Sequence, residues 1–142
     1  MNISAYNRKS DIGLLILRLG IGTTFLLHGV PKLMAGPQVL DQIGGVMAIV
    51  GLGYMPAAWG LAAAITESLG GALLIFGWFT AQAAMAMTTV MAMATLYHIE
   101  KGDGFSVYSH PLELGIVLLS LTLIGPGRIS LDALRFRGRS QN

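Results

Sequence analysis

The sequence of 142 residues contains no cysteine, and this absence excludes several classes of site. Without thiols the chain cannot form a disulfide, a thiol relay, a cysteine-ligated zinc site or an iron–sulfur cluster. It also has no glycine-rich fingerprint for a flavin or a nucleotide. Charge is scarce as well, because only 11% of the residues are Asp, Glu, Lys or Arg, whereas 54% are hydrophobic. Soluble domains usually have about 25% charged residues, so this composition predicts an integral membrane protein.

Four stretches of the sequence are apolar enough to cross a membrane. They comprise residues 12–30, 55–79, 80–97 and 111–124. The last has about 14 residues and reaches only ~21 Å as a helix, so it should begin earlier, near Val107, or the bilayer must be thin there. The pattern predicts an all-α polytopic membrane protein, a single domain over residues 1–142 that forms an antiparallel four-transmembrane-helix bundle. Gly36 and Pro37 precede an amphipathic segment, residues 38–48, which we expect to form a short helix in the outer interface.

The basic residues predict how the bundle is oriented. Six of the nine Lys and Arg residues lie before the first span or after the last, and the connecting loops contain only Lys32 and Lys101. Cytoplasmic segments carry the excess of basic residues, so we expect both termini, including the basic tail over residues 128–142, to be cytoplasmic. This topology and contact with anionic lipid explain the pI of about 9.2, so nucleic acid is not an expected partner.

Glu67 is the most informative residue, because it lies in the middle of an uncharged apolar span. A carboxylate at mid-bilayer depth costs roughly 2.5–3.5 kcal/mol, so it normally faces the bundle interior and has a partner. Arg18, inside the first span, lies ~20 Å from an outer helix end near Pro31. Glu67 lies ~18 Å from the start of its own helix near Met55, and the two depths match. We therefore predict a buried Arg18–Glu67 ion pair and regard both residues as candidate catalytic groups.

Helix periodicity places further polar and small residues on inward faces. On the first span, one face carries Arg18, Gly22, Phe25, His28, Gly29 and Lys32. On the second span, the face of Glu67 also carries Gly60, Ala64, Ser68 and Gly71. Such small residues let membrane helices approach each other closely. On the fourth span, Glu113 lies one turn after His110 and is a third candidate catalytic residue.

All three histidines, His28, His98 and His110, fall near the predicted outer ends of helices, so they should converge on one side of the membrane. With Lys32 and Glu113 they would line the rim of a pocket whose floor is the predicted ion pair. Alternatively, each imidazole only hydrates its own helix end. Imidazole also suits zinc, copper and iron, and His28 with His98 has the makings of a bis-histidine haem site. No pair has tight ligand spacing, so neither a metal nor a haem is expected.

Three segments carry a resemblance to a known family. They are RLGIGTTFLLHGVPK (residues 18–32), ITESLGGALLIFGWFT (residues 65–80) and GPGRISLD (residues 125–132). Together they resemble the DoxX family of four-helix bacterial inner-membrane proteins, over nearly the whole chain. The resemblance implies a place in the bacterial inner membrane and a link to quinone-dependent or other membrane oxidoreductase complexes. By position it singles out Arg18, His28, Gly29, Lys32, Glu67, Gly70 and Gly71. Mechanisms that use a thiol in relatives cannot apply to this cysteine-free chain.

Three functions follow as hypotheses. The first is a membrane oxidoreductase component, whether or not it is catalytic alone, that binds a quinone or a similar small aromatic in the outer half of the bundle. Its binding residues would be His28, Lys32, His98, His110 and Phe25, with Arg18 as a further donor and Glu67 or Glu113 passing protons. Electrons would come from a partner membrane or peripheral redox subunit, and the chain could also form a homo-oligomer. The second hypothesis is a proton-coupled small-molecule transporter that uses Glu67. The third is a noncatalytic accessory or assembly subunit of a membrane complex.

Overall fold

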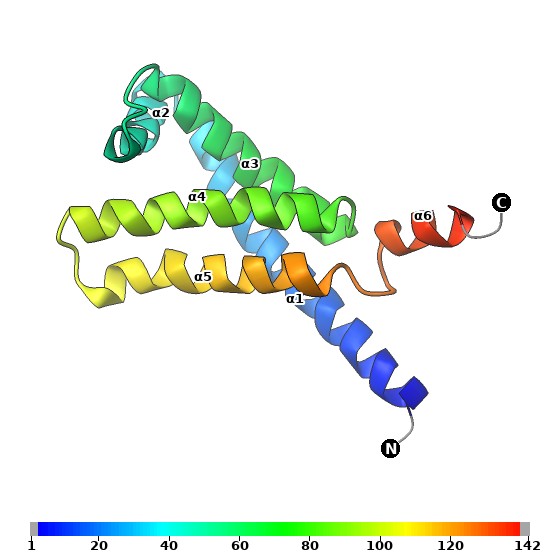
Figure 1. Cartoon of the computed structure of the whole chain (residues 1–142). Coiled ribbons are helices and arrows are strands. Elements are labelled where there is room, and N and C mark those ends of the chain that lie inside the picture. Colours follow the sequence, from blue (N-terminus) through cyan, green and yellow to red (C-terminus); the bar gives the residue numbers. More distant parts are fainter. Residues whose placement is uncertain (1–2, 140–142) are drawn as a thin grey trace.

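The computed structural model describes residues 3–139, with side chains for residues 8–135, and every regular element in this part of the chain is helical (Figure 1). The elements are α1 (Ile3–Met34), α2 (Pro37–Gly44), the 3₁₀ helix η1 (Gly45–Val50), α3 (Pro56–Phe76), α4 (Thr80–Glu100), α5 (Phe105–Ile124) and α6 (Leu131–Arg139). The predicted all-α class is confirmed. The short helix predicted over residues 38–48 corresponds to α2 and most of η1.

Three of these helices, α1, α3 and α5, are long and apolar enough to cross a membrane. α5 has 20 residues and begins at Phe105, so it extends ~30 Å and needs no thinning of the bilayer. α4 has 21 residues, but Gln82 and four threonines lower its mean hydropathy. The fourth crossing, predicted over residues 80–97, therefore stays a prediction.

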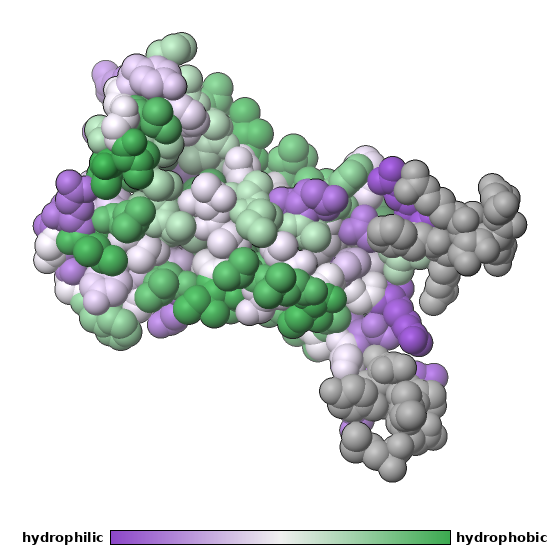
Figure 2. Space-filling view, in the orientation of Figure 1, coloured by the Kyte–Doolittle hydropathy of each residue, from purple (hydrophilic) through white to green (hydrophobic). Residues whose placement is uncertain are grey.

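The surface agrees with a membrane location. Large apolar side chains are exposed on several helices, and Figure 2 shows them gathered along the flank of the molecule. Examples include Leu27 at 70% and Leu123 at 80% exposure. Soluble monomers rarely expose extended apolar patches of this kind. The helices that can span a membrane and this surface identify a membrane protein.

α1 and α3 pack against each other along small residues. A Cβ added to Gly22 would lie 2.6 Å from the carbonyl oxygen of Gly71, and one added to Gly29 would lie 2.5 Å from Oγ of Ser68. Only residues without a side chain permit this approach between the two backbones. The predicted inward face of α3 is confirmed, because its buried residues include Gly60, Ala64, Glu67, Ser68 and Gly71.

The start of α3 packs on α2 rather than on α1. A side chain at Gly60 would overlap the carbonyl group of Leu40, and one at Gly44 would overlap that of Pro56. α2 and η1 together therefore cover the first turns of α3. This contact sets how far α3 extends past the end of α1.

The long helices form two pairs, α1 with α3 and α4 with α5, which are joined by packing of α3 on α4. In Figure 1, α1 passes behind the α4–α5 hairpin at a steep angle, and its N-terminal end projects away from the other helices. Within the described residues, α1 and α5 are not among the helix pairs that pack closely. The core lies where the two pairs cross and includes Phe25, Leu74, Met87, Leu118 and Leu121.

Candidate functional site

A cavity of about 260 Å³ lies between α1, α3, α4 and α5, at the end of the molecule where α1 stops and α5 begins. Its lining residues are Thr24, Phe25, His28, Lys32, Glu67, Met91, Ala94, His98, His110, Pro111 and Leu114. We call it the histidine cavity, because it contains all three histidines of the chain. The structure thus brings together residues that the sequence places on four different spans. Their roles stay predictions.

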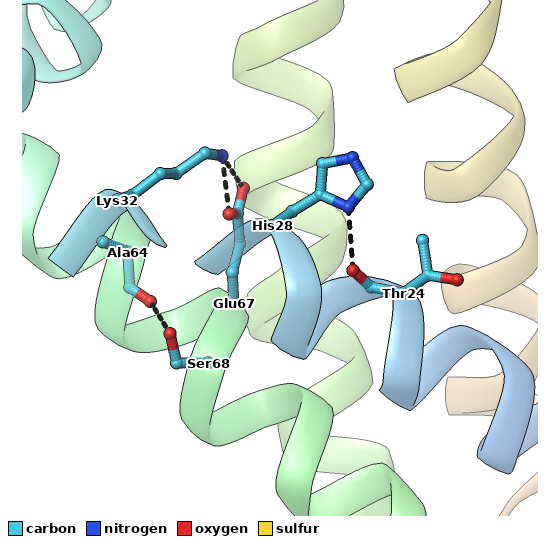
Figure 3. A network of polar contacts seen from close by, with 6 residues as sticks. All are labelled: Thr24, His28, Lys32, Ala64, Glu67 and Ser68. Carbon is cyan, nitrogen blue, oxygen red and sulfur yellow. Dashed lines mark hydrogen bonds and ion pairs between the residues drawn. The ribbon is translucent and has the colours of Figure 1, made fainter. Parts of the chain in front are cut away.

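An ion pair forms one wall of the histidine cavity (Figure 3). Nζ of Lys32 donates to both carboxylate oxygens of Glu67, at 2.8 Å to Oε1 and 2.6 Å to Oε2. The Glu67 side chain is only 3% exposed, whereas that of Lys32 is 32% exposed. The carboxylate is therefore held inside the bundle and the ammonium group reaches it from the cavity rim. Two of the three ammonium protons are used, and one is left for a ligand.

The predicted Arg18–Glu67 ion pair is wrong. Glu67 pairs with Lys32, and Nη2 of Arg18 donates instead to the carbonyl oxygen of Ile129. Arg18 lies against Gly77, which follows Glu67 by ten residues, or ~15 Å along α3. Arg18 is buried, as predicted, but it is not among the lining residues of the histidine cavity.

The depth argument failed because it assumed that α1 ends near Pro31 at the level where α3 begins. α1 continues through Pro31 to Met34, and the start of α3 packs on α2 instead. α3 is therefore shifted along α1 by several residues. This shift brings Glu67 level with Gly29, one turn from Lys32.

Two of the three histidines have a defined ring orientation. Nδ1 of His28 lies 2.8 Å from the carbonyl oxygen of Thr24, one turn earlier on α1 (Figure 3). Nδ1 of His98 lies 2.7 Å from Oδ2 of Asp103, in the loop after α4. Carbonyl and ionised carboxylate oxygens only accept, so Nδ1 carries the proton in both rings. When either ring is neutral, its Nε2 atom is an acceptor for a ligand hydroxyl group.

The other predicted site residues are divided between the cavity and the surface. Phe25 is 3% exposed and forms part of the cavity wall, and His110 lines it from the start of α5. Glu113 does not belong to the rim: it is exposed and is not a lining residue. His110 and Leu114, about one turn apart, face the cavity, and Glu113 lies about 100° around the helix from Leu114. Among residues 8–135, no group of three or more His, Asp or Glu side chains is arranged to hold a metal ion.

Sequence reasoning missed five lining residues, which are Thr24, Met91, Ala94, Pro111 and Leu114. These side chains are small or apolar, so they carry no chemical signature. Helical spacing was the available signal, because Thr24 lies one turn before His28 and Leu114 one turn after His110. Asp103 was missed as well, because nothing in its sequence position identifies it as the partner of His98.

At the opposite end of the bundle, residues 125–132 connect several helices, and we call this segment the C-terminal clasp. The Asp132 carboxylate accepts hydrogen bonds from the backbone N–H groups of Phe79 and Thr80, each at 2.9 Å, where α4 begins. The N–H of Asp132 donates to the carbonyl oxygen of Gly77, also at 2.9 Å. The clasp thereby holds the turn between α3 and α4, in which Phe79 adopts a left-handed backbone conformation (φ 48°).

The clasp is tied to α1 as well. Arg18 donates to Ile129, and Oδ1 of Asp11 accepts from the backbone N–H of Arg128 at 2.9 Å. Leu14 packs near Gly127, whose φ of 75° is in the left-handed region that glycine tolerates. Arg18 therefore belongs to a structural junction and not to the histidine cavity.

One family model and two relatives match the chain. The DoxX family model matches residues 13–99, which include Lys32, Glu67 and His98. The chain is similar to "Putative oxidoreductase CatD" of Bacillus subtilis (strain 168), with 27% identity over 135 residues that cover 94% of each protein. It is 34% identical over 130 residues to an uncharacterised protein of Haemophilus influenzae, covering 87% of this chain and 91% of that protein. No solved structure matches the chain.

Proposed function

The chain belongs to the DoxX family, and from that premise we propose that it is a membrane component of an oxidoreductase system that binds a quinone or a similar small aromatic in the histidine cavity. A relative that aligns over 94% of each chain is named "Putative oxidoreductase CatD", which supports the class of system. One observation carries the proposal: all three histidines and the Lys32–Glu67 ion pair line a single cavity between the helices.

The size and lining of the cavity favour one aromatic ring. Pockets for drug-sized ligands have ~300–1,000 Å³, and this cavity, at about 260 Å³, lies just below that range. Phe25, Met91 and Leu114 supply apolar surface for the faces of a ring. The imidazoles and Lys32 supply polar contacts at its edges. A flat ring that is apolar on its faces and polar at two edges matches this arrangement.

The hydrogen-bonding groups suit both forms of a quinone and quinol couple. The third proton of the Lys32 ammonium group would donate to a quinone carbonyl oxygen. The Nε2 atoms of neutral His28 and His98 would accept from quinol hydroxyl groups. Asp103 would hold His98 in the required tautomer, as a carboxylate partner does for a functional imidazole. This refines the sequence hypothesis, in which His28 served as a donor to carbonyl oxygens.

The remaining parts of the hypothesis concern the surroundings of the cavity. We propose that the cavity lies in the outer half of a bacterial inner membrane, with both termini in the cytoplasm. Electrons would be exchanged with a partner redox subunit, since the sequence has no motif for a redox cofactor. Arg18 and Glu113 lie away from the cavity, so the proposal gives them no contact with the ligand.

The test is a quinone titration of the purified protein followed by tryptophan fluorescence. Trp59 lies near the start of α3, at the cavity end, whereas Trp78 lies in the turn before α4, at the clasp end. We expect saturable quenching that persists in Trp78→Phe and falls strongly in Trp59→Phe, because quenching weakens with distance from the bound ring.

Variants of the cavity sharpen this test. His28→Ala should weaken binding about five- to tenfold, as expected for a lost hydrogen bond of ~1–1.5 kcal/mol. Thr23→Ala, an exposed position on the same helix, is the control and should bind as wild type does. If wild-type protein gives no saturable response, or if His28→Ala binds unchanged, the proposal is wrong. A folded protein that binds no quinone would favour the accessory-subunit hypothesis.

A further inference from the structure

The turn between α3 and α4 carries two exposed aromatic side chains beside the start of α6. Trp78 is 47% exposed and Phe79 is 38% exposed, and their ring centroids lie 5.3 Å apart. Cζ of Arg135, on α6, lies over the Phe79 ring at 5.3 Å from its centroid. Figure 1 shows that α6 begins next to this turn. We call these three residues the aromatic–arginine stack.

Phe79 occupies its place in the stack with an unfavourable backbone conformation. Its φ of 48° and ψ of 38° lie in the left-handed region, which glycine and asparagine adopt more readily than a residue with a bulky side chain. The clasp fixes this conformation, because Asp132 accepts from the N–H groups of Phe79 and Thr80. Backbone strain of this kind clusters at functional positions. The strain beneath an exposed ring therefore indicates a role for that ring outside the core.

The side chain of Arg135 is available to bind an anion. A guanidinium group that lies over an aromatic ring still has N–H groups that point away from the ring. Within residues 8–135, the Arg135 side chain forms no ion pair and no hydrogen bond. Asp132, the carboxylate one turn earlier on α6, is buried and already accepts two backbone hydrogen bonds. Arg135 therefore has no anionic partner in this part of the chain.

The aromatic–arginine stack lies at the level of the helix ends. α3 ends at Phe76, α4 begins at Thr80 and α5 ends at Ile124. The N–H of Asp132 donates to the carbonyl oxygen of Gly77, so α6 starts at this same end. α3 and α5 are each long and apolar enough to cross the hydrocarbon, so their shared end should lie at a membrane surface. Tryptophan side chains are enriched at that level, where lipid headgroups begin.

The charge around the stack is complementary to anionic lipid. After Asp132 the sequence contains three arginines and no acidic residue. Arg128, in the clasp, is exposed, and its side chain also forms no ion pair within residues 8–135. Leu134, next to Arg135, is 62% exposed and adds apolar surface. A phospholipid offers both a phosphate group and acyl chains to such a surface, whereas a free phosphate would contact the arginines alone.

We propose that the aromatic–arginine stack binds the headgroup of an anionic phospholipid, and that Arg135 donates to the phosphate oxygens. Phe79 holds the guanidinium group in place, and Trp78 lies among the glycerol and upper acyl carbons of the lipid. The bound lipid thereby joins α6 to the turn that the clasp holds. This site is separate from the histidine cavity and does not depend on the ligand of that cavity.

The test is quenching of Trp78 by brominated lipid. The chain has two tryptophans, so Trp59→Phe gives a reporter protein in which Trp78 alone fluoresces strongly. The reporter protein is placed in phosphatidylcholine nanodiscs with increasing fractions of brominated phosphatidylglycerol or, separately, of brominated phosphatidylcholine. We expect half-maximal quenching at an about fivefold lower fraction of the anionic lipid. This ratio corresponds to ~1 kcal/mol for one basic residue at the surface.

Two variants of the reporter protein and a matched control locate the site. Arg135→Gln should lower the fivefold preference to less than twofold. Phe79→Asn should lower it as far, and because asparagine tolerates the left-handed backbone this variant should stay folded, which thermal unfolding checks. Arg8→Gln removes an exposed cation from the same end of α1 and should keep the fivefold preference.

Three results would overturn the proposal. Equal quenching by the two lipids would favour an acidic protein segment as the partner of Arg135. An unchanged preference in Arg135→Gln or in Phe79→Asn, or an equal loss in Arg8→Gln, would reduce the effect to diffuse surface charge. Loss of the preference when excess soluble glycerol phosphate is added would assign the site to a water-soluble phosphate instead of a lipid.

Discussion

The two ends of the helical bundle use similar polar residues in opposite ways. At each end α1 presents a cation, Lys32 or Arg18, and a buried carboxylate lies nearby, Glu67 or Asp132. At the histidine cavity the cation binds the carboxylate directly, and empty volume remains beside the pair. At the C-terminal clasp the cation binds a backbone carbonyl group and the carboxylate caps a helix. The difference teaches that buried charge marks a binding site only where space is left for a ligand.

The largest expected effect concerns the side of the membrane that each end faces. If the histidine cavity is periplasmic and the clasp cytoplasmic, reporter fusions after Gly104 and after Asn142 should report opposite compartments, because basic residues concentrate beyond the clasp end. The readout is a pair of reporters, one active only in the periplasm and one active only in the cytoplasm. Finding both fusion points on one side would refute this topology.

The next effect is the loss of one partner of the ion pair. Lys32→Met leaves the Glu67 carboxylate buried and unpaired, so we expect the protein to lose ~3–5 kcal/mol of stability, measured by thermal unfolding in detergent. The double variant Lys32→Met/Glu67→Gln should recover most of this loss. Additive effects of the two substitutions would contradict the pairing. For the same reason, Lys32→Ala is a poor test of ligand binding.

A smaller effect is expected at the clasp. Asp132→Ala removes the two hydrogen bonds to Phe79 and Thr80 and leaves the start of α4 uncapped, which should cost about 2 kcal/mol. Because the clasp is remote from the histidine cavity, quinone affinity of the folded variant should stay within twofold of wild type. Asp41→Ala, an exposed position on α2, is the control and should be neutral in both measurements. A tenfold loss of affinity in Asp132→Ala would show that the two ends are coupled.

The smallest effect is predicted for Glu113. Since its side chain is exposed and does not line the cavity, Glu113→Gln should change stability by less than about 0.5 kcal/mol. Quinone titration should give an unchanged dissociation constant. A loss of binding comparable to that of His28→Ala would return Glu113 to the site.

The sequence predicted helix faces well and helix register poorly. Periodicity depends only on local spacing, so the inward face of α3 around Glu67 and the grouping of His28 with Lys32 followed directly from the chain. The partner of Glu67 could not be predicted from periodicity, because it depends on how far α1 and α3 are offset from each other along their axes. That offset is set by α2, which lies over the start of α3, and by the continuation of α1 through Pro31.

The clasp was beyond sequence reasoning for a related reason. Its contacts join residues more than 50 positions apart, such as Phe79 with Asp132, and they use backbone groups that leave no trace in residue type. The segment at residues 125–132 carried a family resemblance but no indication of its partners. For Glu113 the error was the reverse. Its charge suggested a place in the site, although a charged residue near the end of a membrane helix need only face the lipid headgroups.

The length of α1 makes membrane thickness a variable for this protein. Its 32 residues extend ~48 Å, well beyond the ~30 Å of hydrocarbon in a typical bilayer. A helix with such a mismatch must tilt or project, and the exposed Arg8 and Lys9 near its N-terminal end favour placing the excess among lipid headgroups. α1 crosses the α4–α5 hairpin steeply and is packed mainly on α3, so a change in its tilt swings one wall of the cavity relative to the other. Thinner and thicker bilayers would therefore hold the two walls of the histidine cavity at different separations.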